Sequence, residues 1–465
     1  MRHVGCRRYS RGVSRLCVSL ALGLSLTALA ATPSMSMSTP VAVPSPPVLE
    51  TSWGQVHSKQ LPPPPLVRHA DVEAHLKALK ARSPDFFLLE VVGHSVEGRA
   101  LYHVSVGTGA RHVLLWSQMH GDEPTATTAL LDLLEYLRTH REEPWVSRLL
   151  SELTLHAVPM LNPDGAERFQ RRNAQGIDIN RDALALQTPE ARTLKALRER
   201  LQPFIGFNLH NQGWRHGVGR TGRPASISLL AAAFDEARGD NPGRLLAKKV
   251  CAVIRDAVET LAPGQVGRYD DTFEVRAFGD NMTRWGTPSV LIETGAWPSA
   301  TPDEPLIRLN FVALATALDA LATGRAEQAD VARYESIPQN DSSGIVHLLL
   351  KGVGLFGVDG KPFTGDVGIA VTRAVRTRGK VRSVAHVGRV EELGDLRVLG
   401  ALETVDGAGL FAVPLPAKGA KPGDTVRLPQ PAKHALTLGQ LAELMLVRPL
   451  AQGAWRVERV IRYDR

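Results

Sequence analysis

The sequence predicts an α/β protein with a mixed, largely buried central sheet flanked by helices, followed by a smaller β-rich domain. Between about residue 68 and residue 325, short apolar runs alternate with long amphipathic segments, as strands and helices do in layered folds. Hydrophobic residues make up 43% of the 465 residues, which is enough for a large core. Beyond residue 325 the apolar runs shorten and Gly-rich turns separate them, which is typical of β structure.

The globular pattern begins with residues 70–84, "ADVEAHLKALKARSP", where helical spacing of apolar residues stops at Pro84. Residues 86–107 then predict two strands joined by a turn near Glu97 and Gly98. Further strands are expected at 112–116, 153–159, 204–209, 226–232 and 289–292, and further helices at 125–140, 189–201, 241–261 and 306–322. We expect this α/β domain to span residues 67–325.

The C-terminal part, residues 335–465, is expected to form the β-rich domain, with one helix at 437–447, "TLGQLAELMLV". Few histidines or acidic residues cluster there, so we expect an accessory role. Binding of a glycan or a protein partner is the alternative.

The N-terminal part predicts export. Residues 1–31 have an Arg-rich start, an apolar run from residue 16, and the small-residue pattern Ala28-Leu29-Ala30, which is the layout of a secretory signal peptide. The run is short for a membrane span of about 20 residues, so we expect a periplasmic or secreted protein without a stable span in the mature chain. Residues 32–66 are rich in Pro, Ser and Thr and predict an extended linker or arm.

The formal net charge of +8 argues little for nucleic-acid binding. Residues 1–31 contain five arginines and no acid, so the rest of the chain carries only +3, without a clustered basic face. Outside that segment Cys251 is the only cysteine, which excludes an intramolecular disulfide there. A metal site would therefore use His, Asp or Glu.

Two ionisable residues follow the predicted strand at 112–116. His120 and Glu123 in "MHGDE" are three residues apart, a spacing that places side chains on nearly the same side of a helix start. Such a pair can share a zinc ion. Taken alone the pattern is weak, because most pairs of this kind are surface neighbours.

A second polar segment is "NPDGAERFQRRNAQGIDINRD", residues 162–182, which begins with strong turn residues after another predicted strand. Arg171, Arg172 and Arg181 lie within it, together with Asn173 and Asn180. The planar guanidinium group suits carboxylates, and carboxamides add orientation. A solvated basic loop is the alternative, although asparagine and glycine add little to solubility.

Two further strands end on ionisable residues: "FIGFNLHNQG" on His210 and "TPSVLIETG" on Glu293. Burying the Glu293 carboxylate is costly unless it has a partner, and a metal centre would be one. The carboxyl ends of strands are where open α/β sheets bind ligands.

The ordered set "HGDE", "NPDG", "RRNAQGIDINRD", "NLHN" and "LIETG" resembles the zinc metallocarboxypeptidase family, which contains pancreatic carboxypeptidases A and B, in a bacterial-type exported form. The resemblance covers roughly residues 70–325. It implies a zinc carboxypeptidase-like fold, one zinc ion per chain held by His120, Glu123 and His210, and a peptide substrate with a free C-terminal carboxylate.

The resemblance also implies roles around the metal. Glu293 would be the general base, and Arg171 would stabilise the oxyanion because it stands five residues before Gly176, as in the bacterial "R-x-N-x-x-G" pattern. Asn180 and Arg181 would bind the terminal carboxylate of the substrate, and Tyr269 would match the family's mobile tyrosine. The resemblance thereby implies hydrolysis of the C-terminal peptide bond.

The chain departs from the family pattern in three places. Gly121 and Asp122 stand between the first two ligands, where many members have an arginine, and Asp182 replaces the last residue of "NRN". Tyr269 is 24 residues upstream of Glu293, and it is the only tyrosine nearby. The residue at the floor of the specificity pocket is expected near 278–280, which leaves basic and apolar preferences both open.

Three other functions are compatible with parts of this pattern. Deacylases of the aspartoacylase and succinylglutamate desuccinylase type share His-x-x-Glu and an Asn-Arg pair, but "NPDG" and "IETG" favour the peptidase. An exported enzyme could instead trim cell-wall muropeptides. An inactive binding module is disfavoured because all three ligands and the base are present.

Overall fold

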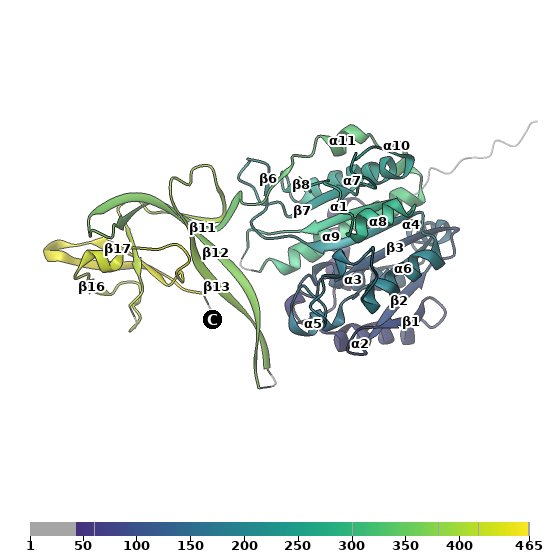
Figure 1. The fold of residues 1–465 in the computed structure, drawn as a ribbon, viewed down its shortest axis with the longest axis horizontal. Helices are drawn as coiled ribbons and strands as arrows, with labels where there is room; N and C mark the ends of the chain where they lie inside the picture. Colours follow the sequence, from purple (N-terminus) through teal and green to yellow (C-terminus); the bar gives the residue numbers. More distant parts are fainter. Residues whose placement is uncertain (1–42, 60, 300, 380, 417, 464–465) are drawn as a thin grey trace, which may run out of the picture. The chain divides into compact units, whose positions relative to one another are not determined.

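The computed structural model describes residues 43–463 except 60, 300, 380 and 417, so the predicted signal peptide lies outside the described residues. An eight-stranded mixed sheet runs through the first part of the chain in the order β1-β2-β4-β3-β5-β9-β7-β8 (Figure 1). Its strands are β1 (Leu88–His94), β2 (Ala100–Val106), β3 (Arg111–Ser117), β4 (Leu153–Val158), β5 (Ile205–Asn211), β7 (Ile227–Ala231), β8 (Val266–Arg268) and β9 (Ser289–Thr294). The predicted fold class is confirmed.

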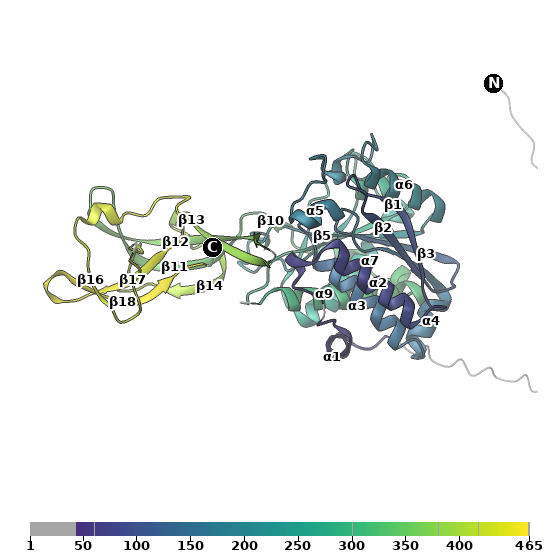
Figure 2. The ribbon, with the colours of Figure 1, turned by 90° about the horizontal axis from the view of Figure 1, so that it is seen from below.

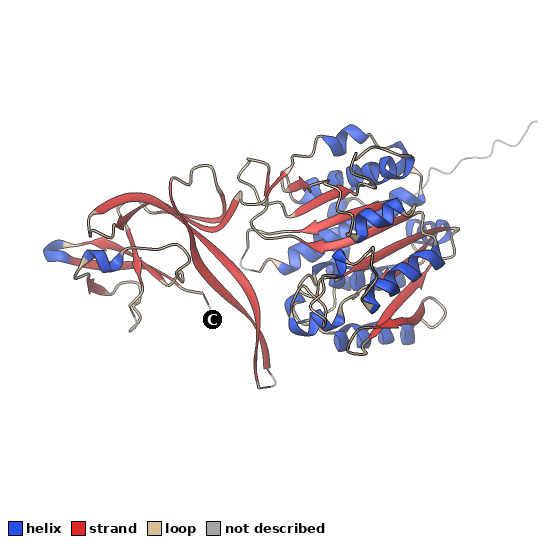
Figure 3. Cartoon of the chain, in the orientation of Figure 1, coloured by secondary structure: helices blue, strands red, loops and turns tan. Residues whose placement is uncertain are grey.

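Strands β4, β3, β5 and β9 are parallel to one another, whereas β1 with β2, β2 with β4 and β7 with β9 are antiparallel. Helices cover both faces (Figures 2 and 3). They are α1 (Pro46–Val56), α2 (His69–Arg82), α3 (Thr125–Thr139), α4 (Pro144–Glu152), α5 (Pro163–Arg168), α6 (Pro189–Leu201), α7 (Pro242–Leu261), α8 (Phe278–Arg284), α9 (Asp303–Ala322), α10 (Arg325–Gln328) and α11 (Val331–Glu335). The helices and strands expected before residue 325 are confirmed.

The side chains of β3 show how the two faces are filled. Val113 and Leu115 belong to the large core that includes α3, α7 and α9. Leu114 and Trp116 point to the other side, where they pack with residues of α6 and α8. Successive side chains of a strand alternate between faces, so an uninterrupted apolar run is what a strand covered on both sides requires.

Helix α9 forms much of the large core. Among the residues that the structure describes, it alone is long and apolar enough to cross a membrane, and most of it is buried inside the protein. It packs against α3 and α7. Its apolar surface is therefore satisfied by the core.

The extended arm expected at 32–66 is wrong for residues 46–56. They form α1, whose Leu49 and Trp53 are buried in the large core. The Nε1 of Trp53 donates to the carboxylate of Asp132 in α3 at 2.8 Å, and His57 Nδ1 lies 2.8 Å from the same group. Prolines at the first positions of a helix are favourable, because the missing amide protons have no intrahelical partner there.

The C-terminal part contains a second sheet, in the order β13-β12-β11-β15-β17-β18-β16 with β14 beside β11. Its strands are β11 (Ile345–Phe356), β12 (Pro362–Arg378), β13 (Val381–Gly394), β14 (Gly400–Asp406), β15 (Phe411–Pro414), β16 (Thr425–Arg427), β17 (Leu444–Pro449) and β18 (Ala454–Ile461). A short pair, β6 (Gly217–Val218) with β10 (Asn340–Asp341), precedes it in the chain. The β-rich character is confirmed, and the domain boundaries stay a prediction.

The helix expected at 437–447 is wrong. Residues 444–447 belong to β17, which pairs with β15 and β18 and is buried on both faces. The run is too short for its periodicity to separate a buried strand from a helix. Pairing with two neighbouring strands decides its conformation.

Candidate active site

The predicted ligands and the predicted base meet at one edge of the main sheet. Strands β3, β5 and β9 are adjacent and parallel, so their carboxyl ends lie side by side. His210 on β5 and Glu293 on β9 are direct partners in the strand register. His120 follows the end of β3 by three residues, and Glu123 precedes α3. The sheet thereby gathers residues from distant parts of the sequence.

His120, Glu123 and His210 form a compact buried cluster. His120 Nδ1 lies 2.8 Å from Glu123 Oε1, and His210 Nδ1 lies 2.7 Å from Glu123 Oε2. The two imidazole nitrogens are 3.1 Å apart. His120 and His210 are each 2% exposed, and Glu123 is 6% exposed. Although burial acts in the opposite direction, the two imidazoles lower the pKa of Glu123, which keeps its carboxylate charged.

A second layer of contacts orients this cluster. Asp178 accepts a hydrogen bond from Arg171 Nε at 2.9 Å, and its other oxygen lies 3.1 Å from His120 Nε2. Arg171 Nη1 lies 3.1 Å from His120 Nδ1 and 3.3 Å from Glu123 Oε1. The second nitrogen of a metal-binding histidine commonly bonds a carboxylate in this way. Asp178 therefore sets the orientation of the His120 ring.

The loops that carry the cluster are held together by Asn162. Its side chain caps α5 by accepting from Gly165 N at 2.9 Å, and its Nδ2 donates to the carbonyls of Met119 and Arg171, each at 3.2 Å. A Cβ atom on Gly121 would come within 2.0 Å of the Gly165 backbone. The segments "MHGDE" and "NPDG" thus need glycine where they touch.

The Glu293 carboxylate is buried beside the cluster. It is 8% exposed, and its Oε2 has no hydrogen-bond partner among the described residues. Burial, reinforced by the Glu123 carboxylate, raises the pKa of Glu293 well above its ordinary value. A buried carboxylate without a partner is unfavourable, and a cation at the cluster would supply the missing positive charge.

The cluster fits a zinc ion on chemical grounds. One potential ligand atom from each of His120, Glu123 and His210 lies within 4.8 Å of the others. Two imidazoles and one carboxylate are an established ligand set of catalytic zinc sites, which leave a further position open. The cluster borders a cavity on one side, so that position would face it.

That cavity has a volume of about 400 Å³. Its lining includes His120, Glu123 and Glu293 together with the other residues predicted to contact substrate, which are Arg171, Asn180, Arg181 and Tyr269. His210 lies behind it as part of the metal cluster. Every predicted site residue is therefore placed in or beside one cavity. Arg172 does not line it, and its side chain donates to the Gly176 carbonyl at 3.1 Å.

The residues expected to bind a carboxylate are preorganised. Asn180, in a short 3₁₀ helix at Ile179–Arg181, accepts a hydrogen bond from Phe278 N at 2.8 Å, which orients its amide group. Arg181 Nη1 donates to the Asn180 carbonyl at 2.8 Å, and its Nε lies 3.3 Å from the Glu274 carboxylate. Burial raises the pKa of Tyr269 to about 12, so its hydroxyl stays protonated.

Several residues of the site were missed from the sequence. Asp178 in the "DINRD" segment is one of them, and its position two residues before the predicted carboxylate clamp is a sequence signal that could have identified it. Asn211 N donates to Glu123 Oε2 at 3.1 Å. Asn208 also lines the cavity, and so does Asp280, which falls within the window 278–280 predicted for the floor of the specificity pocket. Asn208 lies within an apolar strand, and no local pattern distinguishes it.

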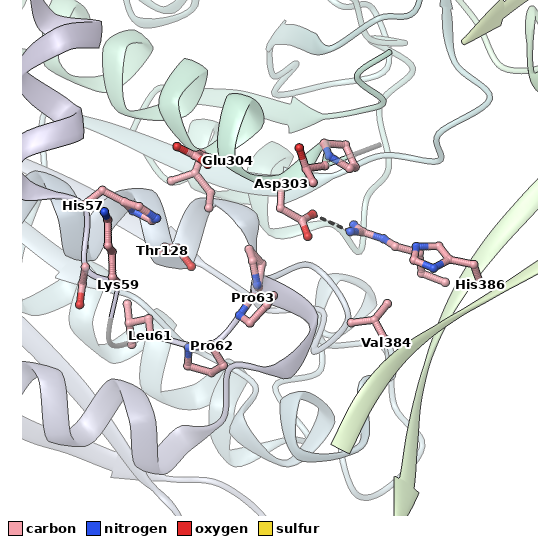
Figure 4. A pocket seen from close by; sticks show the side chains of 16 residues that line it. His57, Lys59, Leu61, Pro62, Pro63, Thr128, Asp303, Glu304, Val384 and His386 are labelled. Atoms are coloured by element: carbon pink, nitrogen blue, oxygen red, sulfur yellow. Dashed lines mark hydrogen bonds and ion pairs between the residues drawn. The ribbon is translucent and has the colours of Figure 1, made fainter. Parts of the chain in front are cut away.

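A second cavity, of about 350 Å³, contains none of the predicted site residues (Figure 4). It lies between the segment that follows α1, the start of α9 and strands β12 and β13. Its Arg373 is paired with Asp303 at 2.5 Å, and His57 is paired with Asp132. These polar side chains are therefore already paired within the protein.

One part of the chain matches a known protein family. Residues 72–211 match the family model described as zinc carboxypeptidase. The resemblance predicted from the motifs is thereby confirmed for this part of the chain.

Among curated relatives, "Probable carboxypeptidase 2" of Trichophyton verrucosum is 30% identical over 162 residues. The aligned region covers 34% of this chain and 28% of the length of that protein. "Carboxypeptidase M" of Mus musculus is 31% identical over 128 residues, and the aligned region covers 24% of this chain and 29% of the length of that protein. The chain thus spans about a third or less of these relatives. A solved metallo-carboxypeptidase from Burkholderia cenocepacia is 18% identical and covers 55% of this chain and 69% of its own, with a TM-score of 0.45.

Proposed function

We propose that the protein is a zinc-dependent metallocarboxypeptidase that hydrolyses the C-terminal peptide bond of peptides. The observation that supports this most directly is the convergence of two chemically different sets in one cavity. His120, Glu123 and His210 are a group of potential metal ligands, and Asn180 and Arg181 offer donors to a carboxylate. A site that binds the substrate's terminal carboxylate next to the hydrolytic centre would restrict cleavage to the C-terminal peptide bond.

Binding begins with the free carboxylate of the substrate. The Arg181 guanidinium donates to it, and the Asn180 amide NH₂ adds a second donor whose direction is fixed by the bond from Phe278 N. The Glu274 carboxylate, which faces Arg181 at 3.3 Å, is the internal group that the substrate replaces. The last peptide bond is then held against the metal cluster.

Zinc, when bound, would polarise the scissile carbonyl and lower the pKa of a coordinated water. Glu293 then removes a proton from the attacking water at its carboxylate and delivers it to the nitrogen of the departing amine. Its position favours this role, because the buried Oε2 of Glu293 has no hydrogen-bond partner among the described residues and can accept the proton.

The negative charge that develops on the carbonyl oxygen has a defined partner. Arg171 is oriented by Asp178 and lies beside His120 and Glu123, so its guanidinium donates into the space where that oxygen forms. Tyr269 supplies a protonated hydroxyl at the same cavity. We assign it a hydrogen bond to the substrate.

We further propose that the protein is exported to the periplasm or the medium. The sequence layout of residues 1–31 supports this proposal. Expression of the full chain followed by fractionation and N-terminal sequencing tests it. Recovery of uncleaved protein in the cytoplasm would contradict it.

The activity is tested by zinc analysis and a substrate panel. The purified chain is expected to hold one zinc ion and to lose hydrolysis when a chelator removes it. The panel contains peptides with free and amidated C-termini, cell-wall muropeptides and N-acyl amino acids, with products measured by mass. Release of C-terminal residues from free-acid peptides alone supports the proposal. Cleavage confined to muropeptides or to N-acyl amino acids would replace it by one of those activities.

A further inference from the structure

Positive charge is concentrated in the hairpin that β12 and β13 form. Residues 367–390 of this hairpin contain six cationic residues and neither aspartate nor glutamate. The cationic residues are Arg373, Arg376, Arg378, Lys380, Arg382 and Arg389. Because residues 32–465 carry a net charge of +3, the same residues without this segment would carry −3. The low net charge therefore conceals one basic element, and the expectation that no basic face is clustered does not hold for this hairpin.

The distal part of the hairpin is a two-stranded ribbon. Strand β11 pairs with β12 only as far as Ile369. Beyond that point residues 372–378 pair with residues 381–387, and no other described strand lies in register with either segment. Figure 1 shows this ribbon continuing beyond the rest of the sheet. Charged side chains on such open edges prevent pairing with another chain, but charges of either sign serve that purpose. The uniform positive sign needs a further reason.

One face of the ribbon is occupied by contacts within the protein. Residues that are directly opposite in an antiparallel pair share a face, and Arg373 with His386 and Val375 with Val384 are such pairs. Arg373 is paired with Asp303 at the start of α9, at 2.5 Å. Val384 and His386 line the second cavity beside this pair (Figure 4). This face therefore contacts the rest of the protein.

The opposite face carries Arg376 opposite Ser383 and Arg378 opposite Val381. Arg378 and Ser383 are exposed, and Val381, next to the turn, is 69% exposed. Within the described residues the ion pair of this ribbon lies on the other face, and neither Arg376 nor Arg378 has an acidic partner. Lys380 follows in the turn and lies outside the described residues. The face thus presents two unpaired guanidinium groups and an exposed apolar side chain.

A partner for this face must supply several anionic groups and a region that accepts an apolar side chain. An anionic lipid bilayer supplies both, because its headgroup phosphates attract arginine and the acyl boundary below them accepts valine. Single-stranded nucleic acid binds largely by stacking on aromatic side chains, and residues 367–390 contain no Phe, Tyr or Trp. A highly acidic polypeptide offers no apolar region for Val381. The bilayer is therefore the partner that fits both features.

We propose that this free face of the β12–β13 ribbon docks on an anionic lipid bilayer. Arg376 and Arg378 donate hydrogen bonds to headgroup phosphates, and Val381 packs at the boundary between the headgroups and the acyl chains. The attachment is reversible, because a few cations and one apolar side chain bind a membrane far more weakly than a spanning helix does. It is independent of the proposed peptidase function, since none of these residues lines the active-site cavity.

The test is co-sedimentation of the full chain with lipid vesicles. One set contains phosphatidylcholine alone, and the other contains equal parts of phosphatidylcholine and phosphatidylglycerol. The protein is expected to bind the anionic vesicles more tightly and to lose most of this difference when NaCl rises from ~0.05 M to ~0.5 M, because salt screens the attraction. Equal binding to both sets at low salt would overturn the inference.

Two variants examine the docking residues directly. The double variant Arg376→Gln with Arg378→Gln removes two charges that form no ion pair, so the fold should be retained, which urea unfolding checks. Its partition onto anionic vesicles should fall about 25-fold, because each cation near such a surface contributes about 5-fold. Val381→Ser should lower the partition by about 5-fold, since an apolar contact is lost. A folded variant that binds like the wild type would contradict the contact assigned to its residue.

The matched control is Lys418→Gln with Arg427→Gln. Both residues are exposed, and Arg427 lies in β16, at the opposite edge of the sheet from β13. The control changes the net charge by the same amount and should stay within about 2-fold of the wild type. Because all these proteins share the same N-terminal residues, differences between them arise from the substituted positions.

Two outcomes would assign the attraction to something else. Equal losses in both double variants would show that the net charge of the protein, and not the ribbon, attracts the vesicles. Tighter binding of duplex DNA or polyglutamate than of anionic vesicles at the same salt concentration would show that the ribbon prefers another polyanion. Either outcome overturns the inference.

Discussion

Replacing Asp178 with asparagine tests whether the buried cluster is a metal site with a supporting layer. Asp178 accepts from Arg171 Nε at 2.9 Å and from Asn180 N at 2.9 Å, and it lies 3.1 Å from His120 Nε2. The variant keeps one acceptor, loses the negative charge, and turns an NH₂ group toward either the His120 ring or the Arg171 guanidinium. The His120 ring should therefore lose orientation and basicity.

Loss of such a supporting carboxylate typically weakens metal binding by about 10- to 100-fold. This corresponds to about 1.4–2.7 kcal/mol of zinc-binding free energy. The assay is competition for zinc with a chromophoric chelator, using metal-stripped wild-type and variant protein at pH 7. The same samples are unfolded in urea with and without zinc, which separates metal affinity from the stability of the fold.

The matched control is Asp319→Asn. Asp319 is 0% exposed and is paired with Arg148 at 2.7 Å and with Arg325, at the end of α9. This variant should lower the free energy of unfolding and leave zinc affinity unchanged. If Asp178→Asn binds zinc within about 2-fold of wild type, or if both variants weaken zinc equally, the assigned role of Asp178 is wrong.

Three further predictions concern the base, the carboxylate clamp and acid stability. Glu293→Gln should retain zinc but lower kcat by roughly 100-fold or more, because general base catalysis contributes a factor of that size. A kcat close to that of the wild type would show that Glu293 is not the general base. Arg181→Ala should raise KM roughly 10- to 100-fold for free-acid peptides, which is the loss expected for one charge-assisted hydrogen bond. If the wild-type protein cleaves amidated peptides as well as free-acid peptides, Asn180 and Arg181 do not bind the terminal carboxylate. His156 hydrogen-bonds His103 and His112 at 3.0 and 2.8 Å, and burial, followed by the charges of these two histidines, lowers its pKa to about 3. The unfolded chain takes up a proton at this histidine near pH 6.5, whereas the folded protein takes it up only near pH 3. The free energy of unfolding is therefore highest above pH 6.5 and decreases as the pH falls toward 3. At pH 4.5 the decrease is roughly 3 kcal/mol for one such histidine. Urea unfolding of metal-free protein at pH 7 and 4.5 measures this loss, which should shrink in His156→Gln; an unchanged loss in that variant would show that other groups cause it.

The fold of the first part of the chain could be predicted because its elements are long and strongly patterned. The run at 112–116 and the helical spacing at 189–201 each match an observed element closely. Prediction failed where local composition was ambiguous. Residues 46–56 have the prolines of a linker but bury Leu49 and Trp53 against the core, and residues 444–447 pair with two strands.

The positions of the main site residues could also be predicted, because they lie in strongly patterned segments. His120, Glu123, His210 and Glu293 stand at strand ends within recognisable motifs, and the structure places all four around one cluster. Their catalytic roles stay predictions until the variants are measured. The floor of the specificity pocket is predicted only within the window 278–280, because the cavity wall is built from several elements.

By itself the sequence determined the alternation of strands and helices and the order in which polar groups appear at strand ends. These features follow from apolar periodicity and turn chemistry, which are local properties of the chain. Only the tertiary structure decided which groups touch. His120 and His210 are separated by 90 positions, yet their nitrogens lie 3.1 Å apart. Strand order and register set that distance, and they are chosen by the packing of the whole core. For the same reason, the sequence of β5 does not show that the Oδ1 of Asn208 lacks a hydrogen-bond partner among the described residues.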